Sequence, residues 1–255
     1  MTTCQHFGET VRRGKYGFRL AREKYALPGN RRSSFYPRRE DIGERAWEAR
    51  AWRFADEEQR IYSDAYVDQQ REAALQNFDR NMAFFARLDS DEFDVALISA
   101  VAAVPALKPV NDLRRWDSVA GVYIMVLDDY RQAYVGQASD IRTRIKQHWT
   151  GTKPFDRLVF GSPDSSVLSI DSFRSLDTTR IFAARTQVPH RLEAKIERSF
   201  PPDFLLNRVS GGILLDEIRD VLTLVGTMKK RELAPAEGGA ESSAGRGAAN
   251  PSPLP

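Results

Sequence analysis

The sequence predicts an α+β protein in which a small mixed domain follows a basic arm and a helical region. Between residues 118 and 212, short β-rich segments alternate with segments whose apolar residues recur at helical spacing. Residues 40–105 contain no proline before Pro105 and no glycine after Gly43, which favours helices. The first 39 residues combine cations, aromatic rings, glycine and proline, which favours an irregular backbone.

The arm, residues 1–39, is predicted to be irregular and to suit a nucleic acid. From Val11 to Arg39 there are ten lysine and arginine residues, while Glu23 is the only acidic residue. Phosphate groups attract such cations, and bases stack on the tyrosine and phenylalanine rings between them. A soluble terminus that binds nothing is the alternative interpretation.

Residues 40–105 are predicted to form helices that precede the mixed domain. One apolar stripe follows a helical spacing and consists of Leu75, Phe78, Met82 and Phe85. Asp91 is predicted to cap a second helix, which ends before Pro105. We expect these helices to pack as a hairpin or to lie on the next domain. A spacer that holds the arm away from the functional site is the alternative.

The mixed domain, residues 118–212, is predicted to contain three strands and two helices. The strand-like segments are residues 121–127, 133–136 and 180–185. The sequence DDYR between the first two suits a turn. Ser139 or Asp140 can cap a helix that runs to about Trp149, and Pro189 suits the first turn of the next helix.

The end of the chain is predicted to add a helix and a disordered tail. The helix covers residues 213–233, and its apolar side consists of Leu215, Ile218, Leu222 and Val225. Residues 234–255 are rich in glycine, alanine, serine and proline. Such a composition cannot bury enough apolar surface to offset the entropy of ordering.

The composition limits the cellular compartment and the kinds of partner that fit the chain. Lys and Arg total 38 against 35 Asp and Glu, so the net charge of +3 is compatible with nucleic acid without requiring it. The single cysteine, Cys4, excludes an internal disulfide and fits a reducing compartment. No apolar run approaches the ~18–20 residues that span a bilayer, and the N-terminus lacks the apolar region of a secretory signal. We therefore expect a cytoplasmic protein without a membrane partner.

Two tyrosine–glycine strings mark the predicted hairpin: Gly121-Val122-Tyr123 and Tyr134-Val135-Gly136. Pairing of these strands would bring the two phenols near one another. On the helix that follows, Arg144 and His148 are four residues apart and therefore share one side. Glu193 and Glu197 lie one turn apart on the second predicted helix.

These residues resemble the signature of the GIY-YIG nuclease family. In both strings a valine replaces the isoleucine of the family. The helix arginine of the family falls on Arg144, and the histidine found in some branches falls on His148. The metal-binding glutamate falls on Glu193, and the proline and asparagine that follow it fall on Pro202 and Asn207.

The resemblance covers roughly residues 119–212. The sequence between Glu193 and Asn207 is slightly longer than in many members of the family. The stretch 151–179 is also long for the family. We interpret it as an insertion or an extended helical region that could carry substrate selectivity.

The resemblance implies a small three-stranded antiparallel sheet flanked by helices, and an endonuclease that hydrolyses phosphodiester bonds in DNA. It implies one divalent metal at Glu193, and a hard carboxylate oxygen suits Mg²⁺ or Mn²⁺. Tyr123 is the predicted general base, because a nearby cation lowers the pKa of a phenol from its ordinary value of ~10. Tyr134 and His148 would orient Tyr123 or the water, and Arg144 would bind the phosphate.

Each of these residues also has an ordinary structural interpretation. The tyrosines could pack over a helix, as strand tyrosines commonly do. Arg144 could pair with Asp140, and His148 could be a cation at a helix C-terminus. Glu197 rather than Glu193 could be the metal ligand.

Other functions remain open at this point. One is a catalytically inactive nucleic-acid-binding protein on the same scaffold, and another is a nuclease that cuts RNA. Arg142 and Lys146 are predicted to be exposed, where they could contact flanking phosphates. Cys4 and His6 lack the second pair of ligands that a structural zinc site needs.

Overall fold

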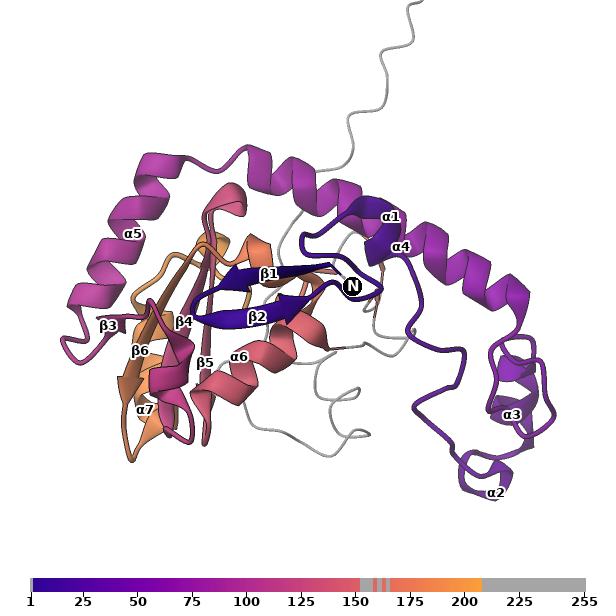
Figure 1. The fold of residues 1–255 in the computed structure, drawn as a ribbon. Helices are drawn as coiled ribbons and strands as arrows, with labels where there is room; N and C mark the ends of the chain where they lie inside the picture. Colours follow the sequence, from indigo (N-terminus) through magenta and orange to yellow (C-terminus); the bar gives the residue numbers. More distant parts are fainter. Residues whose placement is uncertain (1, 152–157, 160–161, 164–165, 208–255) are drawn as a thin grey trace, which may run out of the picture.

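The chain folds around a four-stranded antiparallel sheet with helices on both faces (Figure 1). The computed structural model describes residues 2–151, 158–159, 162–163 and 166–207. Within these residues the α+β class predicted from the sequence is confirmed. The helix expected at 213–233 and the tail expected at 234–255 lie outside the described residues.

The sheet has the strand order β3-β6-β4-β5, and neighbouring strands are antiparallel. Its strands are β3 (Lys108–Pro109), β4 (Gly121–Leu127), β5 (Gln132–Ala138) and β6 (Arg180–Arg185). All three predicted strands are present, but the expectation of a three-stranded sheet was wrong, because β3 pairs with β6 at the edge. A two-residue strand that contains a proline carries no alternating pattern, so the sequence did not reveal it.

β4 and β5 form the hairpin that carries both tyrosine–glycine strings. A short 3₁₀ turn, η2 (Asp128–Tyr130), connects them. In the register of this hairpin, Tyr123 lies opposite Gly136, and Met125 lies opposite Tyr134. The two tyrosines are therefore diagonal neighbours on the same face of the sheet.

Each face of the sheet is covered by different helices. α6 (Ile141–Thr150) packs on the face to which Tyr123 and Met125 belong. α7 (Pro189–Arg198) and α5 (Ser90–Ala102) pack on the opposite face. Alternate residues of β4 thus enter two different cores, which explains why the whole strand is buried and why its sequence is continuously apolar.

The helix ends follow simple capping rules. Of the two predicted caps of α6, Asp140 is the one used, because its side chain accepts a hydrogen bond from the N–H of Thr143. Pro189 occupies the first turn of α7, as predicted. The cap of α5 is Asp89, which accepts from two backbone N–H groups, so the prediction of Asp91 was two residues too late.

The helical region begins with α2 (Arg39–Ile42) and α3 (Glu44–Ala51), which precede the long helix α4 (Asp64–Ala86). α4 packs along α1 (Arg22–Tyr25) and the η2 turn, while α5 contacts α7 (Figure 1). Of the two expected arrangements, the helices therefore lie on the following domain. None of the helices in the described residues combines the length and the apolar character that a membrane crossing requires.

The arm is not irregular throughout, because its first part forms a two-stranded hairpin. β1 (Thr3–His6) pairs with β2 (Glu9–Arg12) around a turn in which Phe7 has a positive φ of 44°. The ring of His6 bonds to the carbonyl of Thr178 at 2.8 Å, which fastens the hairpin to the domain. Gly8, with a φ of 75°, suits the second position of this two-residue turn, but phenylalanine is uncommon at the positive φ of the first, so the sequence analysis did not identify the hairpin.

Candidate active site

Four of the five predicted site residues gather on the α6 face of the β4–β5 hairpin. The Tyr123 hydroxyl lies 2.8 Å from Nε2 of His148, and both side chains are buried, with 0% and 1% exposed. The ring centroids of Tyr123 and Tyr134 are 6.3 Å apart, and Tyr134 meets His148 edge to face at 5.2 Å. Arg144 lies one turn before His148 on α6. The hairpin and the helix therefore bring these four side chains to one place.

The glycines of both strings are required because other atoms occupy the space of a side chain. A Cβ at Gly136 would lie 2.5 Å from the hydroxyl oxygen of Tyr123 and 2.9 Å from Cε1 of Tyr134. A Cβ at Gly121 would lie 2.0 Å from the carbonyl oxygen of Ala184 on β6. Gly136 thus leaves room for the phenols, and Gly121 allows β6 to approach β4.

The structure adds Asp171 to the predicted site residues. Its Oδ1 atom lies 2.6 Å from Nδ1 of His148. An ionised carboxylate only accepts, so Nδ1 carries a proton, and in the neutral imidazole Nε2 is left to accept from the Tyr123 hydroxyl. His148 lies in the last turn of α6, where it is a buried link between a carboxylate and a phenol.

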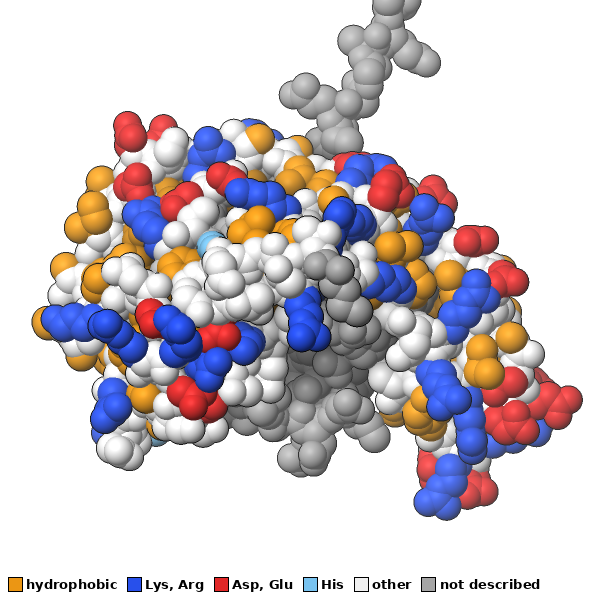
Figure 2. All heavy atoms as spheres, in the orientation of Figure 1, with side chains coloured by type: hydrophobic (Ala, Val, Ile, Leu, Met, Phe, Trp, Pro, Cys, Tyr) orange, Lys and Arg blue, Asp and Glu red, His pale blue; other side chains and the backbone are white. Residues whose placement is uncertain are grey.

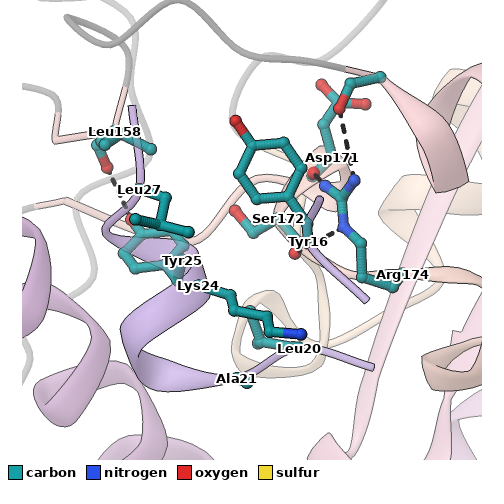
Figure 3. Close-up of a pocket in the computed structure, with 11 residues that line it drawn as sticks. Tyr16, Leu20, Ala21, Lys24, Tyr25, Leu27, Leu158, Asp171, Ser172 and Arg174 are labelled. Atoms are coloured by element: carbon teal, nitrogen blue, oxygen red, sulfur yellow. Dashed lines mark hydrogen bonds between the residues drawn. The ribbon is translucent and has the colours of Figure 1, made fainter. Parts of the chain in front are cut away.

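Asp171 is held in place by the buried Arg174. The guanidinium of Arg174 donates to the carbonyl oxygen of Asp171 (Figure 3) and, at 3.3 Å each, to the carbonyls of Trp149 and Gly151. Asp171 and Arg174 also border a cavity of about 20 Å³, which has room for one water molecule. Asp171 lies inside the stretch 151–179, where no motif spacing marks one aspartate among several, so the sequence did not identify it.

Burial raises the pKa of both phenols above the ordinary value. For Tyr123, the neighbouring Tyr134 adds to this increase, while the charge and hydrogen bond of Arg144 lower the pKa. For Tyr134, the charge of Asp171 adds to the effect of burial. The phenols are therefore protonated at neutral pH, and Arg144 is the group that favours their ionised form. Asp140, the alternative partner of Arg144, is instead the cap of α6.

Glu193 projects from α7, the helix on the opposite face of the sheet, and only 2% of it is exposed. Its Oε2 atom is buried and has no hydrogen-bond partner among the described residues. Burial, followed by the charge of Glu197, raises the pKa of Glu193 to about 7, while a hydrogen bond with Gln137 opposes the increase. A buried carboxylate oxygen without a partner is costly unless the group is protonated or a cation completes its environment.

Glu197 has a different environment from Glu193. Its Oε1 atom accepts a hydrogen bond of 2.6 Å from Nδ2 of Asn207. The same Asn207 side chain bonds to the N–H and C=O of Val135, at 2.9 and 2.7 Å, so it extends the edge of β5. Pro202 begins the 3₁₀ turn η6 that precedes Asn207. Of the two acids, Glu193 is therefore the better candidate for a metal ligand.

The candidate site thus has two parts. The first, the phenol–imidazole cluster, lies on the α6 face and consists of Tyr123, Tyr134, Arg144, His148 and Asp171. The second, the α7 acidic pair, consists of Glu193 and Glu197. The two parts share one electrostatic environment across β5, because the charges of both acids raise the pKa of Tyr134.

Within the described parts of the chain, no three His, Cys, Asp or Glu side chains gather around one point as metal ligands. Mg²⁺ commonly keeps several waters and binds through only one or two carboxylates. The unpartnered oxygen of Glu193 fits such a site, with Glu193 as its protein ligand.

Arg142 and Lys146, which were expected to be exposed phosphate contacts, are ion-paired. The carboxylate of Glu9, on β2, accepts from Nε of Arg142 at 2.7 Å and from Nζ of Lys146 at 2.8 Å. Asp117 accepts a further hydrogen bond of 2.8 Å from Arg142. The side chain of Glu9 is only 5% exposed, so the hairpin of the arm places a buried carboxylate against α6. Sequence spacing could not reveal this pairing over more than 130 residues.

In comparisons with known proteins, no family model matches the chain, and no curated protein or solved structure matches it.

Proposed function

We propose that this chain is a metal-dependent endonuclease that hydrolyses phosphodiester bonds in DNA at a GIY-YIG-type site. The observation that supports this function most is the buried Tyr123 hydroxyl, which bonds to His148 and lies beside Arg144. The order of the elements also supports it, because hairpin, α6, β6 and α7 follow one another as the resemblance leads us to expect.

In the proposed reaction, Tyr123 removes a proton from the attacking water. The phenol first passes its own proton to Nε2 of His148, whose Nδ1–H is bonded to Asp171. The phenolate then takes the proton of the water as the water oxygen bonds to phosphorus. The bond to the leaving oxygen breaks, and that oxygen takes a proton from solvent. His148 then releases the proton it received to solvent, which restores the site. Arg144 favours the phenolate and binds the phosphate as negative charge develops on it.

Glu193 of the α7 acidic pair would hold the metal in this proposal. Mg²⁺ or Mn²⁺ bound to Glu193 would polarise the phosphate and stabilise the leaving oxygen. Asn207 fixes the side chain of Glu197 and ties it to β5, so it also limits the movement of α7 relative to the hairpin.

A second candidate function is nucleic-acid binding without cleavage. Tyr123 is fully buried, so water reaches its hydroxyl only after neighbouring side chains move. The pKa of the Tyr123 phenol is also raised by burial, which opposes its use as a base. Both observations favour a binding protein if the side chains around Tyr123 do not rearrange when substrate binds.

The test is cleavage of supercoiled plasmid by the purified chain with Mg²⁺, with Mn²⁺ and with EDTA. We expect nicking that requires the metal. Arg144→Ala and Glu193→Ala should each lower the rate by about 100-fold or more, because each removes a charge that acts at the phosphate. Arg87→Ala and Glu72→Ala are controls that change exposed residues of the α4 region and should cleave like the wild type.

The outcomes separate the candidates. Wild-type rates in Arg144→Ala or Glu193→Ala would remove the proposed mechanism. A chain that binds DNA and never cuts it, with any metal tested, supports the second candidate. Parallel reactions on RNA of the same sequence determine which polymer is cut.

A further inference from the structure

A distinct unit lies at the N-terminal end of α4, remote from the sheet (Figure 1). It comprises residues 30–62, including α2 and α3, and is called the distal unit below. Its two ends are tied together by backbone hydrogen bonds, from the N–H of Ser33 to the C=O of Arg60 and from the N–H of Tyr62 to the C=O of Arg31, each 2.9 Å. None of the residues of the candidate active site lies in the distal unit.

The distal unit exposes aromatic rings that most folded domains would bury. Tyr36 is 52% exposed, Trp52 is 51% exposed and Phe35 is 37% exposed. Among the described residues, no other large aromatic side chain is as exposed as these three. Figure 2 shows orange and blue side chains next to one another over this region, at the lower right. Exposed rings that cluster beside cations mark an interaction surface.

A groove of about 450 Å³ is built into this surface. It is lined by Arg32, Tyr36, Asp56, Arg60 and Ile61. An antiparallel backbone bridge joins two of these lining residues, Arg32 and Ile61. A groove of this size accommodates a small planar group beside the ring of Tyr36.

The two guanidinium groups of the groove have no carboxylate partner among the described residues. Arg31 pairs with Asp64, whereas no ion pair involves Arg32 or Arg60 among the described residues. The carboxylate of Asp56 accepts the backbone N–H groups of Arg60 and Ile61, at 2.7 to 3.1 Å, so its oxygens are turned toward the loop. The groove thus offers two available cations and one aromatic face.

We propose that this groove binds a single-stranded segment of nucleic acid. An unpaired base stacks on Tyr36, and the adjacent phosphates contact Arg32 and Arg60. A single strand is favoured over a duplex because the faces of paired bases are covered by their neighbours in the stack. Nucleic acid is favoured over a peptide because two unpaired guanidinium groups suit consecutive phosphates. The inference rests on the proposed function only in taking nucleic acid as the partner.

The test is fluorescence anisotropy of a labelled 20-nucleotide oligothymidine with the full chain, in EDTA so that no cleavage occurs. We expect Tyr36→Ala to raise Kd by about 5–100-fold, the usual cost of losing one base-stacking ring. Tyr36→Phe keeps the ring and should bind like the wild type. Arg32→Ala and Arg60→Ala should each reduce the slope of log K against log salt by about 0.7. Arg87→Ala is the matched control and should leave the slope unchanged.

The proposal is overturned if Tyr36→Ala binds oligothymidine like the wild type. It is also overturned if a duplex of the same length binds more tightly than the single strand. A wild type that does not bind the oligonucleotide would overturn it as well, and this is the result expected of a groove that binds peptides. Cleavage is measured separately on plasmid. Loss of oligonucleotide binding in the groove variants therefore supports the proposed binding site even if the chain cleaves no DNA. Normal binding in these variants overturns it even if the chain cleaves DNA strongly.

Discussion

At the scale of single residues, Asp171 selects the form of His148 that the proposed proton transfer requires. Asp171→Asn keeps the size of the side chain but introduces an amide, which can donate to Nδ1 and so favours the wrong tautomer. We expect kcat for plasmid cleavage to fall by on the order of 100-fold, with little change in DNA binding. Nitrogen NMR of the imidazole should show the proton moving from Nδ1 to Nε2.

Asp68→Asn is the control for this experiment, since Asp68 is exposed on α4. A wild-type rate in Asp171→Asn, with the tautomer of His148 unchanged, would mean that the carboxylate has no part in the reaction.

Glu193 links stability to pH. Its pKa is raised from 4.5 to about 7, mainly by burial, so the folded protein retains this proton over a range in which the unfolded chain releases it. The stability contributed by this group therefore falls as pH rises through that range, by on the order of 3 kcal/mol. We expect Glu193→Gln to lack this loss and to be more stable than the wild type at pH 8. Urea unfolding at pH 5 and pH 8 measures the difference, and an equal loss in both proteins would contradict it.

The same proton couples Glu193 to a metal. Because a bound cation requires the ionised carboxylate, we expect the affinity for Mn²⁺ to rise with pH until about 7 and then to level off. Electron paramagnetic resonance of free Mn²⁺ reports this without any cleavage. Glu193→Gln should lose the binding, while Glu72→Gln should keep it. Mn²⁺ binding that is the same in all three proteins would place the metal elsewhere.

At the scale of elements, the sequence predicted those parts whose chemistry is local. Strands β4 and β6 are apolar runs, and the helices α6 and α7 begin at Asp140 and Pro189, which have clear capping roles. The elements that were missed depend on long-range contacts. Edge strand β3 exists only through its pairing with β6, and the β1–β2 hairpin turns at a phenylalanine.

Gly136 belongs to strand β5 and also borders the ring of Tyr123 in the candidate site. A methyl group at this position would lie 2.5 Å from the Tyr123 hydroxyl oxygen and 2.6 Å from its Cζ, so Gly136→Ala must displace the ring of Tyr123. We expect a stability loss of about 1–3 kcal/mol from overpacking, and a loss of cleavage that exceeds this loss of folded protein. Gly14→Ala is the control, because nothing lies within 4 Å of its added carbon. Thermal unfolding and plasmid cleavage are measured on both variants. Equal behaviour of Gly136→Ala and Gly14→Ala would contradict the interpretation that the added methyl group displaces Tyr123.

At the scale of the whole molecule, the candidate site combines segments that no sequence window joins. The hairpin, α6 and α7 carry the residues that spacing and resemblance could predict. Asp171, from the stretch 151–179, joins the site through its hydrogen bond to His148, and Glu9, from the arm, joins α6 through three hydrogen bonds to Arg142 and Lys146. Because such contacts depend on the tertiary fold, they leave no periodic signal in the chain.

Glu9 couples the N-terminal hairpin to the helix that carries Arg144 and His148. The hydrogen bond from Arg142 is the main reason that the pKa of Glu9 is lowered, and Lys146 acts in the same direction. A carboxylate whose pKa is lowered in the folded state stabilises the fold above its ordinary pKa, and this stability is lost as pH falls through the folded value. Glu9→Gln should therefore be less stable than the wild type by about 1–2 kcal/mol at pH 7, and this difference should shrink as pH falls below the ordinary pKa of a glutamate.

The same change should strengthen binding of nucleic acid, because it removes a negative charge and releases Lys146, and in part Arg142, which keeps its bond to Asp117, to contact phosphates. We expect tighter binding of duplex DNA in EDTA and a salt dependence that is steeper by about 0.9 for each phosphate gained. Asp79→Asn, which removes the ion pair between Arg22 on α1 and Asp79 on α4, is the control. If Glu9→Gln changed stability but not the salt dependence, the hairpin would be a structural clamp on α6 alone, without influence on how the chain contacts DNA.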